Sequence, residues 1–238
     1  MKLPLAILAG GLGKRLGRKT IHNPKALMDV AGKPFISRQL TYLSNQGFKN
    51  IVICTAHLGK KIKDYVGNGS KYNLNVLYSD DGNKPLGTGG SIKKASIILD
   101  KNFFILYGDS FLPIDFSLIE KAFFNEEKPA LMTILKNQGK WDKSNTYFEN
   151  KCIVYNKKNP KVNMNYIDYG VSVVNNSIFE GFPDHENFDI AEVFEKLSKS
   201  RQLAGYEVKE RFYEIGSVNG LNDTIEFFKK MEKNNYDL

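Results

Sequence analysis

The sequence contains only two cysteines, three histidines and one tryptophan, and it has no long run of apolar residues. Cys54 and Cys152 are too few and too far apart to indicate a disulfide framework or a zinc site. No apolar stretch approaches the roughly 20 residues that a transmembrane helix needs. The first residues form a short apolar strand that leads into glycines, which is not the pattern of a signal peptide. We therefore expect a cytoplasmic protein that does not enter a membrane.

The net charge is +8, from 34 lysines and arginines against 26 acidic residues. Such a charge raises the possibility of nucleic-acid binding. The lysines are scattered, however, and there is neither a dense basic block nor an RNA-binding aromatic signature. A positive balance also suits an enzyme with phosphorylated, anionic substrates. We expect small-molecule partners and no nucleic acid, and the sequence leaves open whether the chain forms homo-oligomers.

Apolar strands alternate with amphipathic helices through the first half of the 238 residues. This alternation predicts an α/β fold with a doubly wound, mostly parallel sheet. We expect one domain, with residues 1–125 forming one half and residues 126–238 a second half that adds a smaller substrate-covering subregion. Asp189 and Glu192 form a capping-box pattern at the start of one helix. The predicted strands are residues 3–8, 50–55, 74–78, 103–107, 130–135, 152–156, 167–174 and 203–208, and the predicted helices lie within residues 35–46, 58–66, 91–99, 189–199 and 221–233.

The first strand runs directly into Gly10, Gly11 and Gly13, and two cations follow, Arg15 and Lys25. Glycines allow backbone N–H groups to turn toward a ligand, and several such groups form an anion-binding concavity. The arginine and the lysine would add full positive charges. The stretch therefore predicts a phosphate-binding loop.

Two common phosphate loops are excluded by the residues themselves. A Walker A loop needs Ser or Thr after Gly13-Lys14, where this chain has Arg15. A dinucleotide fingerprint that begins at Gly11 would need a third glycine where Leu16 stands.

Residues 8–16 (Leu-Ala-Gly-Gly-Leu-Gly-Lys-Arg-Leu), with residues 24–27 and 32–34, resemble the signature of the sugar-1-phosphate nucleotidyltransferases. The resemblance continues through residues 86–90, 107–110 and 213–217. It implies a Rossmann-like nucleotidyltransferase fold. It also implies an enzyme that joins a nucleoside triphosphate to a sugar 1-phosphate and releases pyrophosphate.

The resemblance assigns catalytic roles to Arg15 and Lys25, which would neutralise the triphosphate and the transferring α-phosphate. Asp109 ends an apolar strand and offers the hard oxygen ligand that Mg²⁺ prefers. By resemblance its partner in the metal site is Glu214, where most relatives carry aspartate. The extra methylene leaves open whether Glu214 binds the metal directly. No nucleophilic side chain is required, and we assign no catalytic role to the three histidines.

The resemblance also places the two substrates. The nucleotide would contact Leu8, Ala9, Gly10, Gly11, Gly13, Asp81, Gly87 and Thr88. The sugar phosphate would contact Lys157, Asp168 and Gly170, with Lys158 an equal rival to Lys157 and with Trp141 and Asn145 as further lining residues.

Across the whole chain, residues 30–35, 86–90, 104–110, 167–170 and 211–216 resemble the D-glycero-D-manno-heptose 1-phosphate guanylyltransferases most. Guanine offers an N1–H and a 2-amino group, which Asp81 could accept. We therefore expect GTP and a heptose 1-phosphate as substrates, for surface polysaccharide synthesis. The alternatives are a uridylyl- or cytidylyltransferase on another sugar phosphate, such as N-acetylmuramate 1-phosphate, and a non-catalytic nucleotide-binding relative.

Overall fold

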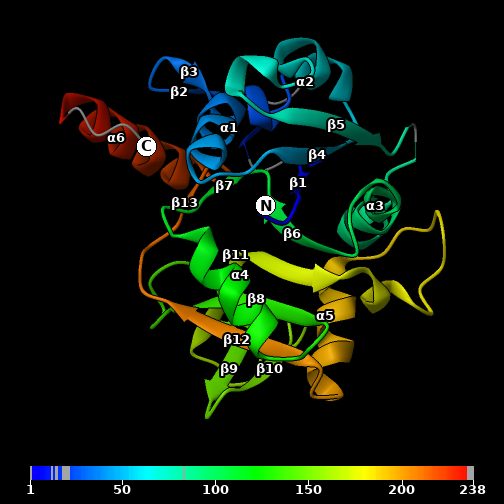
Figure 1. Cartoon of the computed structure of the whole chain (residues 1–238). Coiled ribbons are helices and arrows are strands. Elements are labelled where there is room, and N and C mark those ends of the chain that lie inside the picture. Colours follow the sequence, from blue (N-terminus) through cyan, green and yellow to red (C-terminus); the bar gives the residue numbers. More distant parts are fainter. Residues whose placement is uncertain (1, 12, 14–15, 18–21, 83, 235–238) are drawn as a thin grey trace.

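The computed structural model of the chain describes residues 2–11, 13, 16, 17, 22–82 and 84–234. Within these ranges nine strands form one large sheet. The order of its central strands is β11 (Tyr166–Asn175), β6 (Asn102–Tyr107), β1 (Leu5–Leu8), β4 (Asn50–Thr55) and β5 (Asn75–Asp80). The sheet runs through the middle of the molecule, with helices on both faces (Figure 1). The predicted doubly wound α/β fold is confirmed.

The four strands that the first half contributes to the large sheet are all parallel to one another, as predicted. Three of them are almost continuously apolar because both faces of the sheet are covered there, whereas the edge strand β5 (Asn75–Asp80) has exposed residues among its buried ones. These strands are β1 (Leu5–Leu8), β4 (Asn50–Thr55), β5 (Asn75–Asp80) and β6 (Asn102–Tyr107), and the helices among them are α1 (Phe35–Asn45), α2 (Gly59–Val66) and α3 (Gly87–Ala95).

The second half extends the same sheet with mixed pairing. Strand β11 (Tyr166–Asn175) is antiparallel to β6 on one side and to β8 (Ala130–Lys136) on the other. Strand β12 (Leu203–Val208) then pairs with β8 in parallel. The remaining elements are α4 (Phe116–Asn125), the antiparallel pair β9 (Thr146–Glu149) and β10 (Cys152–Tyr155), α5 (Ile190–Lys199) and α6 (Val218–Lys233).

Two pairings of two-residue strands lie outside the large sheet. Strands β2 (Asp29–Val30) and β3 (Lys33–Pro34) form a small hairpin beside α1 and α6 (Figure 1). Strand β7 (Ser110–Phe111) pairs with β13 (Tyr213–Glu214), which brings the segment after β6 against the segment before α6. None of the helices in the described ranges is long and apolar enough to cross a lipid bilayer.

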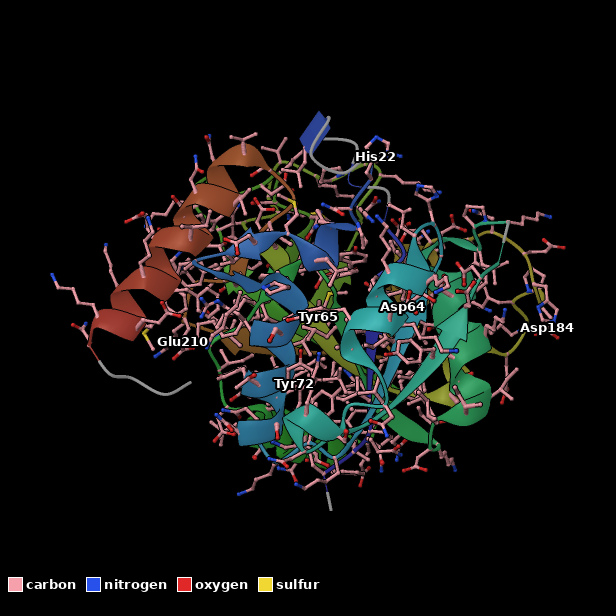
Figure 2. The ribbon with its side chains drawn as sticks, turned by 90° about the horizontal axis from the view of Figure 1, so that it is seen from above. His22, Asp64, Tyr65, Tyr72, Asp184 and Glu210 are labelled. Carbon is pink, nitrogen blue, oxygen red and sulfur yellow. The ribbon has the colours of Figure 1, made fainter. Side chains whose placement is uncertain are left out.

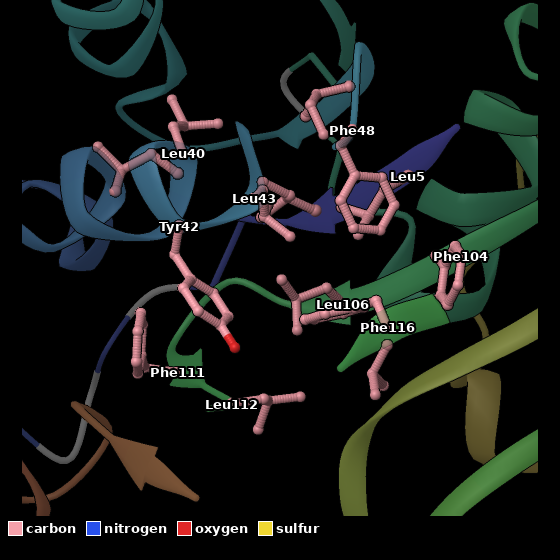
Figure 3. Close-up of a cluster of buried hydrophobic side chains, with 14 of the residues drawn as sticks. Leu5, Leu40, Tyr42, Leu43, Phe48, Phe104, Leu106, Phe111, Leu112 and Phe116 are labelled. Atoms are coloured by element: carbon pink, nitrogen blue, oxygen red, sulfur yellow. The ribbon is translucent and has the colours of Figure 1, made fainter. Parts of the chain in front are cut away.

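Successive residues of the strands point to opposite faces and enter two separate apolar clusters. Leu5 and Phe104 enter the cluster under α1 and α4, whereas Ala6 and Ile105 enter the cluster under α3 and α5. Figure 3 shows the first cluster, in which the ring of Phe48 packs edge-to-face on Phe104 at a centroid distance of 5.3 Å. Burial on both faces fixes the strands in register.

The ends of several helices differ from the prediction for identifiable reasons. Helix α3 begins at Gly87 rather than at residue 91, because the N–H of Gly89 donates to the carbonyl of Phe188 and docks this turn on a distant segment, at 2.9 Å. Helix α6 begins at Val218 because the Ser217 hydroxyl caps it. Helix α4 and strand β9 were not predicted.

The predicted capping box at α5 is present only in part. Asp189 caps the helix and accepts from the N–H of Ala191 at 3.0 Å. Glu192, however, accepts a hydrogen bond from Lys158 at 3.1 Å. The predicted start of the helix is therefore confirmed, while the Glu192 carboxylate forms an ion pair with Lys158.

Candidate active site

A cavity of about 250 Å³ lies at the carboxyl ends of β1 and β6. Ligands of open α/β sheets bind at this edge. The cavity brings together nine residues that the sequence predicted for the site. They are Leu8, Ala9, Gly10, Gly11, Lys25, Asp81, Gly87, Thr88 and Asp109.

Backbone hydrogen bonds hold the ends of three strands together at this cavity. The N–H of Ala9 donates to the carbonyl of Cys54 at 2.9 Å, and the N–H of Gly108 donates to the carbonyl of Leu8 at 3.0 Å. Cys54 is buried, and burial raises the pKa of its thiol. The glycine loop therefore begins at strand ends that are held together by backbone hydrogen bonds.

Asp81 lines this cavity, and its two carboxylate oxygens have different surroundings. Its Oδ2 accepts hydrogen bonds from the Ser91 hydroxyl at 2.6 Å and from the N–H of Leu86 at 3.2 Å. Its Oδ1 is buried and has no hydrogen-bond partner among the described residues. Buried carboxylate oxygens are normally paired, so this atom is suited to accept from a ligand.

Gly87 and Thr88 line the same cavity and connect it to α5. Gly87 has a φ of 70°, and a Cβ there would overlap the carbonyl oxygen of Phe188, so the position requires glycine. The Thr88 hydroxyl donates to Asp189 at 2.8 Å and accepts from the N–H of Ile190 at 2.9 Å. The start of α5 therefore fixes the position of Thr88.

Lys25 and Asp109 both line the cavity and form an ion pair, with 2.6 Å between Nζ and Oδ2. The lysine is held on a short 3-10 helix (Lys25–Leu27) and its side chain is 13% exposed. A charge this protected from water acts strongly on a nearby anion.

The absence of a side chain at Gly216 lets three charged groups come together beside its backbone. A Cβ there would lie 2.7 Å from Glu214 Oε2, 2.9 Å from Lys25 Nζ and 3.3 Å from Asp109 Oδ2. Two carboxylates and phosphate or water oxygens are the usual ligands of Mg²⁺ at nucleotide sites. The residues present here therefore fit a divalent cation between Asp109 and Glu214.

The Glu214 carboxylate is also bound to the start of α6. Its Oε2 accepts from the N–H groups of Gly216 and Ser217, the latter at 3.0 Å, and its Oε1 accepts from the Ser217 hydroxyl. A helix N-terminus favours a negative charge. Glu214 is therefore held beside Asp109 by backbone and hydroxyl donors.

A second, larger cavity of about 650 Å³ adjoins the first and shares Tyr107 and Asp109 with it. The first cavity is lined by residues within 8–109, and the second by residues within 107–223. The predicted residues that line the second cavity are Lys157, Asp168, Gly170, Glu214, Trp141 and Asn145.

Asp168 is the most perturbed acid of this cavity. Burial raises its pKa to about 6, although hydrogen bonds from the Gly170 N–H and the Tyr107 hydroxyl and the charge of Lys157 act to lower it. Burial, and then the Asp168 carboxylate, raise the pKa of Tyr107, which therefore remains a donor. A carboxylate held in this way can accept hydrogen bonds from sugar hydroxyls.

The two neighbouring lysines have different surroundings. Lys157 lines the second cavity and pairs with Asp189 at 2.8 Å. Lys158 pairs with Glu192 on α5 at 3.1 Å and is not part of the cavity wall. Burial raises the pKa of Asp189, but hydrogen bonds from Lys157, the Ala191 N–H and Thr88 lower it overall. Asp189 thus contacts one residue of each cavity.

Sequence reasoning missed Tyr107, Asp189 and Arg211. The guanidinium of Arg211 lies over the rings of Trp141 and Tyr213, at 4.3 and 4.5 Å from their centroids, in the wall of the second cavity. Tyr107 directly precedes the Gly-Asp pair after β6, so its position was a usable signal. Arg211 lines the second cavity, and Asp189 contacts Thr88 and Lys157, only through tertiary contacts.

Not every predicted residue of the site lies within the described part of the chain. Arg15, the predicted catalytic arginine, and Lys14 lie outside the described residues. Gly13 has the positive φ, 61°, that favours glycine, but it does not line either cavity. The histidines are exposed, and Figure 2 shows His22 at the rim of the molecule.

Comparison with protein families gives a match over almost the whole chain. The model of the family described as nucleotidyl transferase matches residues 5–231. The chain is 30% identical over 214 residues to a D-glycero-alpha-D-manno-heptose 1-phosphate guanylyltransferase of Aneurinibacillus thermoaerophilus, covering 88% of this chain and 91% of that protein.

Two further relatives differ in what they share with the chain. An N-acetylmuramate alpha-1-phosphate uridylyltransferase of Neisseria meningitidis serogroup B is 43% identical over 112 residues, which is 47% of this chain and 48% of that protein. The crystal structure of HddC from Yersinia pseudotuberculosis, in complex with GMP-PN, superposes with a TM-score of 0.78 at 23% identity. That superposition covers 95% of this chain and 100% of the other.

Proposed function

Because this chain belongs to the nucleotidyl transferase family, we propose that it joins a nucleoside triphosphate to a sugar 1-phosphate and releases pyrophosphate. The observation that carries the proposal is the pair of adjoining cavities, which share Tyr107 and Asp109. One cavity would hold the nucleotide and the other the sugar phosphate. We propose that residues 1–125 and 126–238 are the corresponding halves of a single domain.

The reaction is an in-line attack of a phosphate oxygen of the sugar 1-phosphate on the α-phosphorus of the nucleotide. The new bond joins the two phosphates, and the bond to the β-phosphate breaks as pyrophosphate leaves. Negative charge spreads over the phosphoryl oxygens, so positioning and electrostatic stabilisation carry the catalysis. Lys25 supplies a protected positive charge at the junction of the cavities. Arg15 is proposed to supply a second charge, on the sequence resemblance alone.

We propose Mg²⁺ as the cofactor, held by Asp109 and Glu214 beside Gly216. When bound, the ion would offset the negative charge of the phosphates. The two carboxylates and Lys25 fix where the triphosphate must lie, and Ser217 keeps Glu214 directed toward Asp109.

We propose GTP as the nucleotide. The unpartnered Oδ1 of Asp81 supports this choice, because guanine carries an N1–H and a 2-amino group that a carboxylate can accept. A base without such donors would leave the buried oxygen unsatisfied, which gives strong discrimination. The acceptor proposed is D-glycero-D-manno-heptose 1-phosphate, used for surface polysaccharide synthesis, as the guanylyltransferase similarity suggests.

The sugar phosphate would lie in the larger cavity. Lys157 is proposed to contact its phosphate and Asp168 its hydroxyls, while Gly170 leaves room for the ring. Ammonium groups carry three donors, so Lys157 can keep its bond to Asp189 while it binds a phosphate oxygen.

A uridylyltransferase on N-acetylmuramate 1-phosphate is the second candidate. It is favoured by the 43% identity over 112 residues to a protein of that activity. Uracil offers a single N–H, so the same Asp81 oxygen could accept from it with less selectivity.

Purified protein with Mg²⁺ should be tested against GTP, UTP, CTP and dTTP in combination with heptose, N-acetylmuramate, glucose and mannose 1-phosphates, with products identified by mass. We expect GDP-heptose to form fastest. Faster formation of a UDP- or CDP-sugar would refute the guanylyl proposal, and no nucleotide-sugar with any pair would refute the proposed function.

A further inference from the structure

Glu214 is tied to α6 through its backbone as well as its carboxylate. The hydroxyl of Thr224, which is fully buried, lies 2.9 Å from the carbonyl oxygen of Glu214 and 2.7 Å from that of Gly220. The carboxylate in turn accepts from Gly216 and Ser217. The acid is therefore held against the first turn of the helix and cannot swing freely.

Gly220 occupies that first turn in a conformation that does not need glycine. It lies within α6 and is not among the glycines with positive φ. Glycine is an unfavourable residue in a helix interior, where alanine is the most favourable. The helical conformation itself therefore gives no reason for glycine at this position.

The space beside Gly220 is occupied by the Glu214 side chain. A Cβ at position 220 would overlap Oε1 and the carboxyl carbon of Glu214, and it would lie 2.8 Å from the carbonyl oxygen of Glu214. The carboxylate can hold its present place beside Lys25 and Asp109 only if residue 220 has no side chain.

We infer that Gly220 is a positioning residue for the acidic pair, Asp109 and Glu214. Because position 220 has no side chain, there is room for the glutamate at position 214. A shorter aspartate at position 214 would not need this room. This inference rests on the proposed function for the use of the acidic pair. A methyl group at position 220 would force the Glu214 carboxylate away from Gly216 and out of the space beside Asp109.

The test is a double-mutant cycle with Gly220→Ala, Glu214→Asp and the combined variant. A Cβ at position 220 would lie 2.8 Å from the carbonyl oxygen of residue 214 whether that residue is glutamate or aspartate, so this contribution cancels in the cycle. The coupling energy therefore reports the interaction of residue 220 with the side chain of residue 214. Asn222→Ala is the matched control, because Asn222 is exposed two residues further along α6. The readouts are Mn²⁺ binding, measured by electron paramagnetic resonance with the metal alone, and the thermal unfolding temperature.

We expect Gly220→Ala to weaken Mn²⁺ binding about tenfold or more in the native background, and less than about threefold in the Glu214→Asp background. Asn222→Ala should change neither readout. An equal effect of Gly220→Ala in both backgrounds would overturn the inference. If Gly220→Ala fails to fold while the combined variant folds, the coupling is supported; if neither folds, glycine serves the backbone and the inference is wrong.

The double-mutant cycle measures Mn²⁺ binding and the unfolding temperature, so its result does not depend on catalytic turnover. If the native protein forms no nucleotide-sugar but the Mn²⁺ coupling is present, the proposed function fails and the positioning role stands. If the native protein is active and the coupling is absent, only the inference about Gly220 fails.

Discussion

Replacing Asp168 with asparagine should stabilise the substrate-free protein above pH 6 while it weakens use of the sugar phosphate. Burial raises the pKa of Asp168 to about 6, against the effect of its two hydrogen-bond donors. In the unfolded chain an aspartate titrates near pKa 3.9. Between about pH 4 and pH 6 the native protein therefore keeps a proton that the unfolded chain has lost.

The direction and size of the effect follow from this difference. Because the native state binds more protons in that window, the free energy of unfolding falls as pH rises from about 4 to 6 and stays lowered above it. A shift of about two pKa units corresponds to at most about 3 kcal/mol, and the partial solvent exposure of Asp168 reduces this figure. Asparagine carries no charge, and its Oδ1 can still accept from the N–H of Gly170. It should raise the unfolding temperature by about 2–4 °C for each kcal/mol recovered.

Calorimetric unfolding at pH 4.5 and pH 8 without substrates measures the effect. The variant should be more stable than the native protein at pH 8, and the difference should shrink at pH 4.5. Asp100→Asn, at an exposed position, is the control and should show no such pH dependence. The reasoning is refuted if Asp168→Asn is less stable at pH 8, or if its advantage is the same at both pH values.

Three further changes test the two cavities. Lys25→Ala should lower turnover by about 100-fold or more with an unchanged circular dichroism spectrum, and a folded variant with near-native turnover would remove Lys25 from the mechanism. Asp189→Asn can still accept from Thr88 and Ala191 but loses its charge; it should raise the KM for the sugar phosphate by up to about fivefold and leave the nucleotide KM unchanged. Glu192→Gln, which disrupts the neighbouring Lys158 pair, should change neither KM. Asp81→Asn should reduce the ratio of kcat/KM for GTP over UTP by about tenfold or more, and an unchanged ratio would show that Asp81 does not bind the base.

Much of the fold was predictable because the apolar strands are long and both faces of the sheet are buried. Strands β4 and β12 have the same bounds as predicted. The start of α3 was predicted four residues too late, since that turn is stabilised by the Phe188 carbonyl about a hundred residues further along the chain. Helix α4 was missed although Asp115 caps it, accepting from Ser117 at 2.8 Å, and Ile119 and Phe123 follow at helical spacing.

The first cavity was more predictable than the second. Leu8, Asp81 and Asp109 each lie at or just after the end of a parallel strand, and such ends share one edge of the sheet. The wall of the second cavity combines part of β11 with loops and with α6, and the arrangement of these segments depends on tertiary contacts. The sequence could not decide which of the two lysines, Lys157 or Lys158, lies in the cavity wall. The outcome depends on tertiary ion pairs at the start of α5, where Lys157 pairs with Asp189 and Lys158 with Glu192.

The fate of the individual phosphates of the nucleotide tests the central claim most directly. Reactions with GTP labelled at the α- or at the γ-phosphorus, together with a sugar 1-phosphate and Mg²⁺, distinguish nucleotidyl transfer from every other use of the two cavities. We predict that the α-label enters a nucleotide-sugar and that the γ-label leaves as pyrophosphate, only when both substrates are present. Transfer of the γ-label to the sugar, or its release as orthophosphate without a sugar phosphate, would contradict the account.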